Sequence, residues 1–154
     1  MKKLILVAAL LVFLCAGTAF AQFGIGVHGG YGGHGGGGGL NLAFSNIYIY
    51  VDAAIGDSNG IGVSGAVDFW QFLGGNIASG FSWYWRLGIP VSLWLGDELG
   101  LAAGVRAPIG ISWKPINMVE IFLQAVPQIS LQILPKIDLW PNFWGGNLGI
   151  RFWF

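Results

Sequence analysis

The sequence is poor in charge, cysteine and histidine. Of its 154 residues, 9% are charged, one is a cysteine and two are histidines. A soluble globular domain carries about 25% charged residues, so this composition argues against a domain surrounded by water. Disorder is excluded too, because 55% of the residues are hydrophobic and disordered chains lack apolar mass. A helical membrane protein is also disfavoured, since the chain has 27 glycines and each costs a helix ~1 kcal/mol.

The first segment has the pattern of a secretory signal peptide. Lys2 and Lys3 make a positive start, an apolar run covers Leu4 to Leu14, and Ala19-Phe20-Ala21 is a small-x-small cleavage site. The run is shorter than the ~20 residues that a membrane-spanning helix needs. We therefore predict a signal peptide over residues 1–21 and a single domain, an outer-membrane β-barrel, over residues 22–154.

The only cysteine, Cys15, falls inside this signal. The mature chain then has no cysteine, which excludes disulfides, thiolate catalysis and cysteine-based metal sites. The two histidines, His28 and His34, lie in or beside a glycine-rich loop expected over residues 35–39. They could bind a metal weakly, but no nearby group completes a site, so we interpret them as incidental loop residues. We expect no metal, no cofactor and no catalytic residue.

From residue 22 onward the dominant pattern has a period of two, which is typical of strands. Ser45-Asn46 and residues 57–60 have the chemistry of turns. The alternation predicts eight strands, over residues 23–31, 40–44, 47–55, 61–70, 81–95, 99–113, 119–134 and 146–154.

The two faces of these strands differ sharply. One face of the later strands is almost entirely Leu, Ile, Val and Trp, while the other is small, polar or ionic. In water the apolar face would be an aggregation-prone patch. In lipid it is the proper outer surface, and a closed barrel pairs every backbone polar group. The predicted fold class is all-β, an eight-stranded antiparallel up-and-down transmembrane β-barrel after an N-terminal signal peptide.

The charged residues agree with this prediction. Without Lys2 and Lys3 the chain has five basic and seven acidic residues, and none of them falls on the apolar face. Half are expected in turns, at Asp57, Asp97, Glu98, Lys114, Lys136 and Asp138. The other half are expected to line the lumen as an ionic cluster: Asp52, Asp68, Arg86, Arg106, Glu120 and Arg151. We interpret this cluster as a plug of paired charges; a narrow ion path or ligand site is the alternative.

Aromatic residues gather at the strand ends that lie near the two termini. Because an even number of strands brings the C-terminus back to the starting side, this end is expected to be periplasmic. Such clustering is typical of the aromatic girdle at a membrane interface. The girdle is expected from Phe23, Phe44, Phe69, Trp70, Phe81, Trp83, Trp113, Phe152, Trp153 and Phe154.

The last eight residues, Asn147 to Phe154, resemble the C-terminal signal of outer-membrane proteins. This resemblance implies that Gly149, Phe152 and Phe154 are assembly determinants recognised by the barrel-assembly machinery.

The mature chain also resembles a small outer-membrane β-barrel family of uncertain function, best known from spirochaetes. In fold this family is similar to OmpA-type and OmpX-type eight-stranded barrels. The similar stretches are Asp68-Phe69-Trp70, Arg106 to Ile111, Val119 to Pro127 and Gly149 to Phe154. The resemblance implies a barrel rather than a reaction.

Three prolines depart from the expected pattern. Pro90, Pro108 and Pro127 fall in strands that a closed barrel pairs on both sides, and proline donates no ladder hydrogen bond. We expect bulges there, with a register shift at Pro127.

We therefore expect a non-enzymatic structural or envelope component of the bacterial outer membrane, with an ionic plug in its lumen. The alternative is a narrow porin-like or small-ligand transport barrel that uses Arg86, Arg106, Asp52 and Glu120. A rim enzyme is remote, because the acidic residues near the outer rim have no His or Ser partner that the pattern aligns. The expected partners are outer-membrane lipid and the barrel-assembly machinery, with the protein a monomer. Nucleic acid is disfavoured because no basic patch exists.

Overall fold

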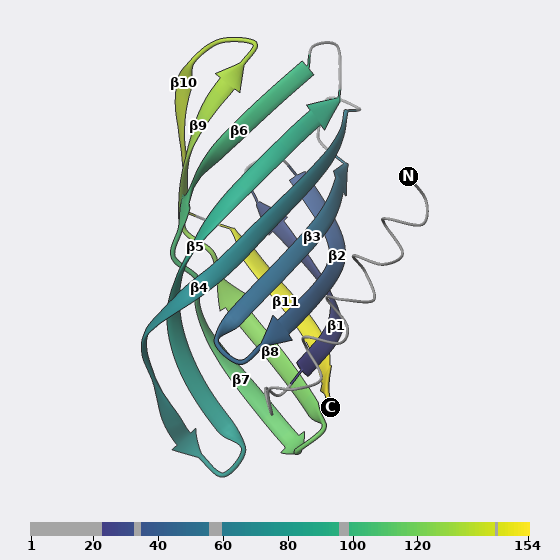
Figure 1. Cartoon of the computed structure of the whole chain (residues 1–154), viewed down its shortest axis with the longest axis vertical. Coiled ribbons are helices and arrows are strands. Elements are labelled where there is room, and N and C mark those ends of the chain that lie inside the picture. Colours follow the sequence, from purple (N-terminus) through teal and green to yellow (C-terminus); the bar gives the residue numbers. More distant parts are fainter. Residues whose placement is uncertain (1–22, 33–34, 56–59, 96–98, 144) are drawn as a thin grey trace, which may run out of the picture.

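The computed structural model describes residues 23–32, 35–55, 60–95, 99–143 and 145–154. These residues form one antiparallel sheet that closes on itself (Figure 1). Among them, no helix is long and apolar enough to cross a membrane. The strands are β1 (Phe23–Gly32), β2 (Gly35–Phe44), β3 (Ile47–Ile55), β4 (Ile61–Ala78), β5 (Phe81–Leu95), β6 (Leu99–Arg106), β7 (Ile109–Ile116), β8 (Val119–Ala125), β9 (Gln128–Leu134), β10 (Asp138–Asn142) and β11 (Gly146–Trp153).

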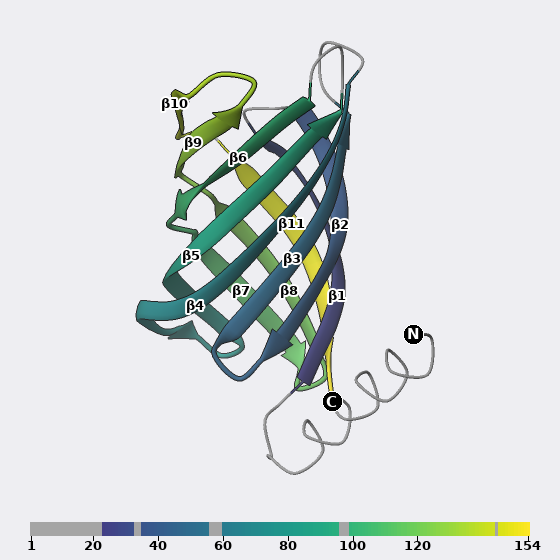
Figure 2. The ribbon, with the colours of Figure 1, turned by 45° about the horizontal axis from the view of Figure 1, so that its top comes forward.

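The eleven segments make an eight-stranded barrel, because three of its strands are interrupted. β6 and β7 both pair with β5, so they are two parts of one strand. β9 and β8 pair with those two parts in turn, and β10 and β11 pair with β9 and β8. The pairing of β1 with β11 then closes the barrel, as Figure 2 shows from a second direction.

Both ends of the described chain lie at the same end of the barrel (Figure 1). Phe154 N donates to Phe23 O at 2.7 Å, and three two-residue turns after β2, β4 and β7 lie at this end. Two of the turns use the left-handed region, at Ser45 (φ 54°) and Gly80 (φ 78°). We call this end the terminal end and the opposite one the loop end.

The interruptions at Pro108 and Pro127 leave the register between β6–β7 and β9–β8 unchanged. Ile109 faces Ala125 and Arg106 faces Gln128, so the two ladders continue across the gap without a shift. Ala107 N donates to Pro127 O at 2.9 Å, which bridges the two breaks. The predicted register shift at Pro127 is therefore absent on the side of β6 and β7. It is present on the side of β10 and β11, where residues 126–127, between the pairs Ala125–Gly146 and Gln128–Asn142, lie opposite residues 143–145.

Pro90 lies inside an unbroken β5. It faces Ala66 of β4, and the β5–β6 ladder has no pair between Gly88–Arg106 and Val91–Ala103. The register is the same on both sides of this gap, so the expected bulge is absent here too. Bulges occur instead in β4 near the terminal end, at three places between Asp68 and Ala78.

Three elements differ from the sequence prediction. Residues 35–39, expected as a loop, belong to β2, where they pair with β1 and β3. β4 continues eight residues beyond its predicted end at Trp70, and β10 was not predicted. All-glycine and bulged segments carry no alternation, and for this reason the period-two pattern did not reveal them.

The outer and inner faces follow the predicted alternation. Val27, Val51, Val91 and Leu131 are examples of the large hydrophobic side chains exposed on the outside. The inside holds a core of buried residues, made of Ala43, Tyr48, Tyr50, Ala66, Phe122 and Trp153. The molecule is thus apolar outside and mixed aromatic and polar inside, the inverse of a water-soluble barrel.

Candidate functional site

The predicted lumen residues all lie on the inner face of the barrel. Five of them are buried, and the sixth, Asp52, has a side chain that is 24% exposed. They come from β3, β4, β5, β6, β8 and β11, so the charges surround the lumen rather than lining one side.

Asp68 and Arg106 form a two-bond ion pair across the lumen. Arg106 donates from Nε to Asp68 Oδ1 at 2.6 Å and from Nη2 to Oδ2 at 2.7 Å. The two residues are not on neighbouring strands, because Gly88 of β5 lies between them in the register. A Cβ at Gly88 would overlap the Asp68 carboxylate. The missing side chain therefore leaves the space in which the pair forms.

Glu120 and Arg151 form a second pair, on directly opposite positions of β8 and β11. Arg151 Nη1 lies 3.0 Å from Glu120 Oε2, and Trp153 Nε1 donates to the same oxygen at 2.7 Å. Arg151 Nε also donates to Asn41 Oδ1 at 2.8 Å. That bond crosses Gly26, which separates Arg151 from Asn41 in the register. Trp153, expected in the outer girdle, is thus an interior residue.

Asp52 contacts a histidine rather than an arginine. His28 Nε2 lies against Asp52 Oδ1, again across a glycine, Gly39 of β2. The His28 ring meets the Tyr50 ring edge-on, with 5.2 Å between their centroids. The interpretation of His28 as an incidental loop residue is wrong: it is a buried residue of β1 on the inner face. His34 lies outside the described residues.

Arg86 has no carboxylate partner among the described residues. Its guanidinium carbon lies 3.5 Å from the ring centre of Tyr48 and 3.7 Å from that of Tyr84. Tyr84 donates its hydroxyl to Gln124 Oε1 at 2.9 Å, over Gly110 of β7. A cation over an aromatic face is attracted by the ring quadrupole. Two tyrosine rings thus hold Arg86 in place of a carboxylate.

The other cations also lie over aromatic rings. Arg106 lies over Tyr50 at 4.5 Å, and Arg151 lies over Tyr48 at 4.8 Å and Phe122 at 4.9 Å. Lys114, expected in a turn, belongs to β7, and its Nζ is 4.6 Å from the Trp153 ring centre. The lumen therefore holds a set of cations that lie over aromatic rings. We call this set, together with its two ion pairs, the lumen cluster.

Two of the remaining predicted turn charges, Lys136 and Asp138, lie at the loop end. Asp138 begins β10, and Lys136 is exposed in the connection before it. Asp57, Asp97 and Glu98 fall outside the described residues. In the part of the chain that the structure describes, no three His, Cys, Asp or Glu side chains form a group that could hold a metal ion.

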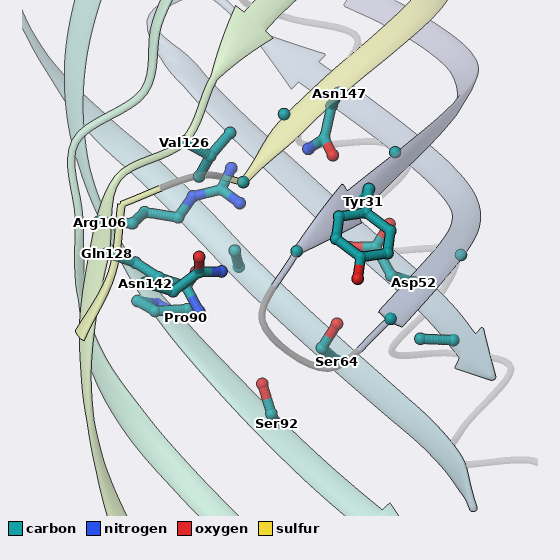
Figure 3. A pocket seen from close by; sticks show the side chains of 18 of the residues that line it. Tyr31, Asp52, Ser64, Pro90, Ser92, Arg106, Val126, Gln128, Asn142 and Asn147 are labelled. Atoms are coloured by element: carbon teal, nitrogen blue, oxygen red, sulfur yellow. The ribbon is translucent and has the colours of Figure 1, made fainter. Parts of the chain in front are cut away.

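A polar cavity of about 130 Å³ lies in the lumen near the loop end (Figure 3). Asp52, Ser64 and Ser92 line it from β3, β4 and β5, where they are consecutive cross-strand partners. Arg106 and Asn147 line it from β6 and β11. The lumen cluster therefore does not fill the barrel to its loop end.

The three residues of the predicted assembly signal lie on β11 or just after it. Phe152 and Phe154 are exposed on the outer face, and Phe154 stacks on Phe23 with 6.3 Å between ring centroids. Gly149 points inward, where a Cβ would overlap the Phe122 ring. Phe152 and Phe154 thus face outward and Gly149 faces inward, as the alternation along a strand requires.

Sequence reasoning missed the partners of the charges. The alternation in β1 places His28 on the same face as Gly24 and Gly26, and this signal could have placed it in the lumen. The glycines that let side chains meet across a strand, and the roles of Asn41 and Trp153, depend on register, which one sequence does not display.

Comparison with known proteins supports the fold. No protein-family model matches the chain, and no curated protein matches its sequence. The N-terminal β-barrel domain of Pseudomonas aeruginosa OprF is similar, with a TM-score of 0.53 and 15% identity over 86% of this chain and 97% of that one. Neisserial surface protein A (NspA) has a TM-score of 0.47 and 12% identity over 88% and 98%. The predicted all-β, eight-stranded antiparallel barrel is confirmed: the chain has the fold of the eight-stranded outer-membrane β-barrels. The predicted signal peptide, residues 1–21, lies outside the described residues.

Proposed function

We propose that this protein is a non-enzymatic structural component of the bacterial outer membrane whose lumen is closed by an ionic plug. Three observations support its insertion into lipid: the apolar outer face, the closed ladder and the likeness to the OprF barrel domain. In lipid every backbone polar group needs an internal partner, and a closed barrel provides one. The predicted signal over residues 1–21 fits export to that membrane.

The plug rests on one observation above all, the pairing of buried charges on the inner face of the barrel. The Asp68–Arg106 and Glu120–Arg151 pairs connect four different strands through buried contacts. An eight-stranded barrel is just wide enough for its side chains to fill. Buried ions are tolerated when they are paired and hydrogen-bonded. Displacing these groups to let water or solute pass would expose charges that now neutralise one another.

Arg86 supports the same interpretation without a carboxylate. It is buried between Tyr48 and Tyr84, and these rings occupy space that a conducting path needs. The guanidinium carbon is within 3.7 Å of both ring centres. The arrangement favours a rigid filling over a mobile gate.

We further propose that the terminal end faces the periplasm and that the barrel functions as a monomer. Phe23, Phe44, Phe81 and Trp113 lie at that end, in two aromatic contacts with centroid separations of 4.9 and 5.6 Å. Amphipathic and aromatic rings prefer the interface of a membrane. The exposed Phe152 and Phe154 at the same end are accessible to the barrel-assembly machinery.

Conductance of the purified mature protein in planar lipid bilayers tests the plug. We expect little or no steady conductance from the wild type. Arg106→Ala removes the cation that neutralises Asp68, and it should introduce measurable openings. Lys136→Ala, at an exposed position outside the lumen, is the matched control and should behave as the wild type. Large, stable and reproducible channels in the wild type would contradict the plug and favour the porin-like alternative.

A further inference from the structure

The cavity at the loop end has a polar lining and is not filled by the lumen cluster. It holds about 130 Å³, which corresponds to about four water molecules at ~30 Å³ each. A ligand of a few non-hydrogen atoms fits this space. The lining includes the hydroxyls of Ser64 and Ser92, the amides of Gln128 and Asn147 and two charged groups, so it suits a polar ligand better than an apolar one.

One wall of the cavity presents an unused guanidinium nitrogen. The Nε and Nη2 atoms of Arg106 are bound to Asp68, whereas Nη1 donates no hydrogen bond to the described residues. The side chain is only 5% exposed, and it points into the cavity beside Val126 and Asn147 (Figure 3). A buried arginine nitrogen with free N–H groups is suited to a carboxylate. A Cβ at Gly30 would overlap the Asn147 amide, so that glycine leaves room for Asn147 on this wall.

The other wall presents an unused carboxylate oxygen. Asp52 Oδ1 faces His28, while Oδ2 accepts no hydrogen bond from the described residues. Ser64 lies opposite Asp52 in the register and Ser92 lies opposite Ser64, so two hydroxyl oxygens continue this wall as further acceptors. Figure 3 shows Asp52 and Arg106 on opposite sides of the cavity. The site therefore offers a negative end and a positive end to a single small molecule.

We propose that this cavity binds a small α-amino acid zwitterion from the loop-end side. Arg106 Nη1 and Asn147 bind the ligand carboxylate, and Asp52 with Ser64 and Ser92 binds the ligand ammonium group. A carboxylate alone satisfies only the Arg106 wall, and an amine alone satisfies only the Asp52 wall. A polyol of similar size meets the hydroxyls and amides but brings no charge. This inference goes beyond the proposed plug, because a closed lumen accommodates the cavity equally well.

Titration of the full mature barrel in detergent micelles tests the proposal, with glycine, acetate, methylamine and glycerol as four separate probes. Proton–nitrogen NMR of the Arg106 Nε–H and the Ser92 backbone amide reports occupancy. Glycine should give saturable shifts, and acetate and methylamine should bind about tenfold more weakly, because each lacks one charged contact. Absence of saturable glycine binding would overturn the proposal. So would acetate or methylamine binding as tightly as glycine, since the site would then recognise one charge.

Variants test the two walls independently. Asp52→Asn keeps the shape of the side chain and should weaken glycine binding about tenfold, and Ser92→Ala should weaken it by a smaller factor. Ser112→Ala removes a buried inward hydroxyl of β7 outside this cavity and should leave glycine binding unchanged. Unchanged affinity in both cavity variants would overturn the assignment. Should Asp52→Asn fail to fold, the comparison among the four probes on the wild type still decides.

Discussion

Asp68 and Arg106 are two strands apart, yet their side chains meet in a two-bond ion pair because Gly88 separates them in the register. The same arrangement recurs at Gly26, between Arg151 and Asn41, and at Gly39, between His28 and Asp52. Inner-face glycine is thus a positional requirement of the lumen cluster. In this small barrel, polar side chains from two strands can contact each other over a third strand because the residue between them is glycine.

This relationship predicts a strong effect of Gly88→Ala. The new methyl group would overlap the Asp68 carboxylate, whereas a Cβ at Gly65 of β4 finds its nearest neighbour, Tyr50 O, at 3.7 Å. Gly88→Ala should lower the free energy of unfolding by about 1–3 kcal/mol, the usual cost of overpacking. Gly65→Ala, the control, should change it little. Urea unfolding of the barrel in lipid vesicles measures both, and equal effects would contradict the role assigned to Gly88.

The Asp68–Arg106 pair should show strong coupling in a double-mutant cycle. Arg106→Met leaves the Asp68 carboxylate buried without its cation, and Asp68→Leu does the reverse. Each single change should cost about 3–5 kcal/mol of unfolding free energy, and the double variant should cost clearly less than their sum. The exposed Lys136→Met gives the background effect of losing a positive charge. Additive costs would mean that the two side chains do not depend on each other.

Arg86 should not be replaceable by lysine. A guanidinium is planar and can lie between two rings, whereas an ammonium group is a compact charge that cannot stack. Because the Arg86 guanidinium lies at 3.5 Å and 3.7 Å from the Tyr48 and Tyr84 ring centres, Arg86→Lys should destabilise the barrel by about 1–2 kcal/mol. Lys136→Arg, at an exposed site, is the control for exchanging lysine and arginine, and it should leave the stability unchanged. Wild-type stability in Arg86→Lys would show that charge alone suffices there.

The assembly proposal separates biogenesis from stability. Phe154 is 71% exposed and stacks only on Phe23 among the aromatic contacts of the described residues. Phe154→Ala should therefore reduce the amount of barrel assembled in cells several-fold while the purified protein still refolds in detergent. Phe143→Ala removes an exposed ring elsewhere and should assemble normally. Heat-modifiable mobility on a denaturing gel reports the folded fraction, and normal assembly of Phe154→Ala would contradict the proposal.

The sequence predicts most of the fold because lipid requires apolar side chains on the outer face, and each strand therefore alternates between apolar and small or polar residues. This alternation is the rule that the prediction uses. Strands β3 and β5 begin and end at their predicted residues, since long apolar alternation leaves little freedom. The alternation is lost in residues 35–39, where glycine takes the place of both outward and inward side chains. It is also lost in β4 after Asp68, where bulges change which residues point outward. It also gives no information about the strand breaks at Pro108 and Pro127, because hydrogen bonds around the prolines keep the β6–β9 and β7–β8 ladders in one register.

The candidate site could be predicted only in part, for a related reason. Alternation indicates which side chains point inward, and the six predicted charges do so. It does not indicate which of them meet, because contacts across the lumen depend on register and on the residue between. Asp52 therefore has a histidine as its neighbour, and Arg86 has two tyrosines.

The last strand has two roles in one stretch of eight residues. Phe152 and Phe154 face outward at its end, while Arg151 and Trp153 bring to Glu120 the cation and the N–H donor that it contacts. Before β11 docks between β8 and β1, Glu120 lacks both partners and Asn41 lacks its bond from Arg151. Closing the wall and neutralising Glu120 are therefore one event. A barrel left open at this seam retains an uncompensated negative charge, which distinguishes it energetically from the finished molecule.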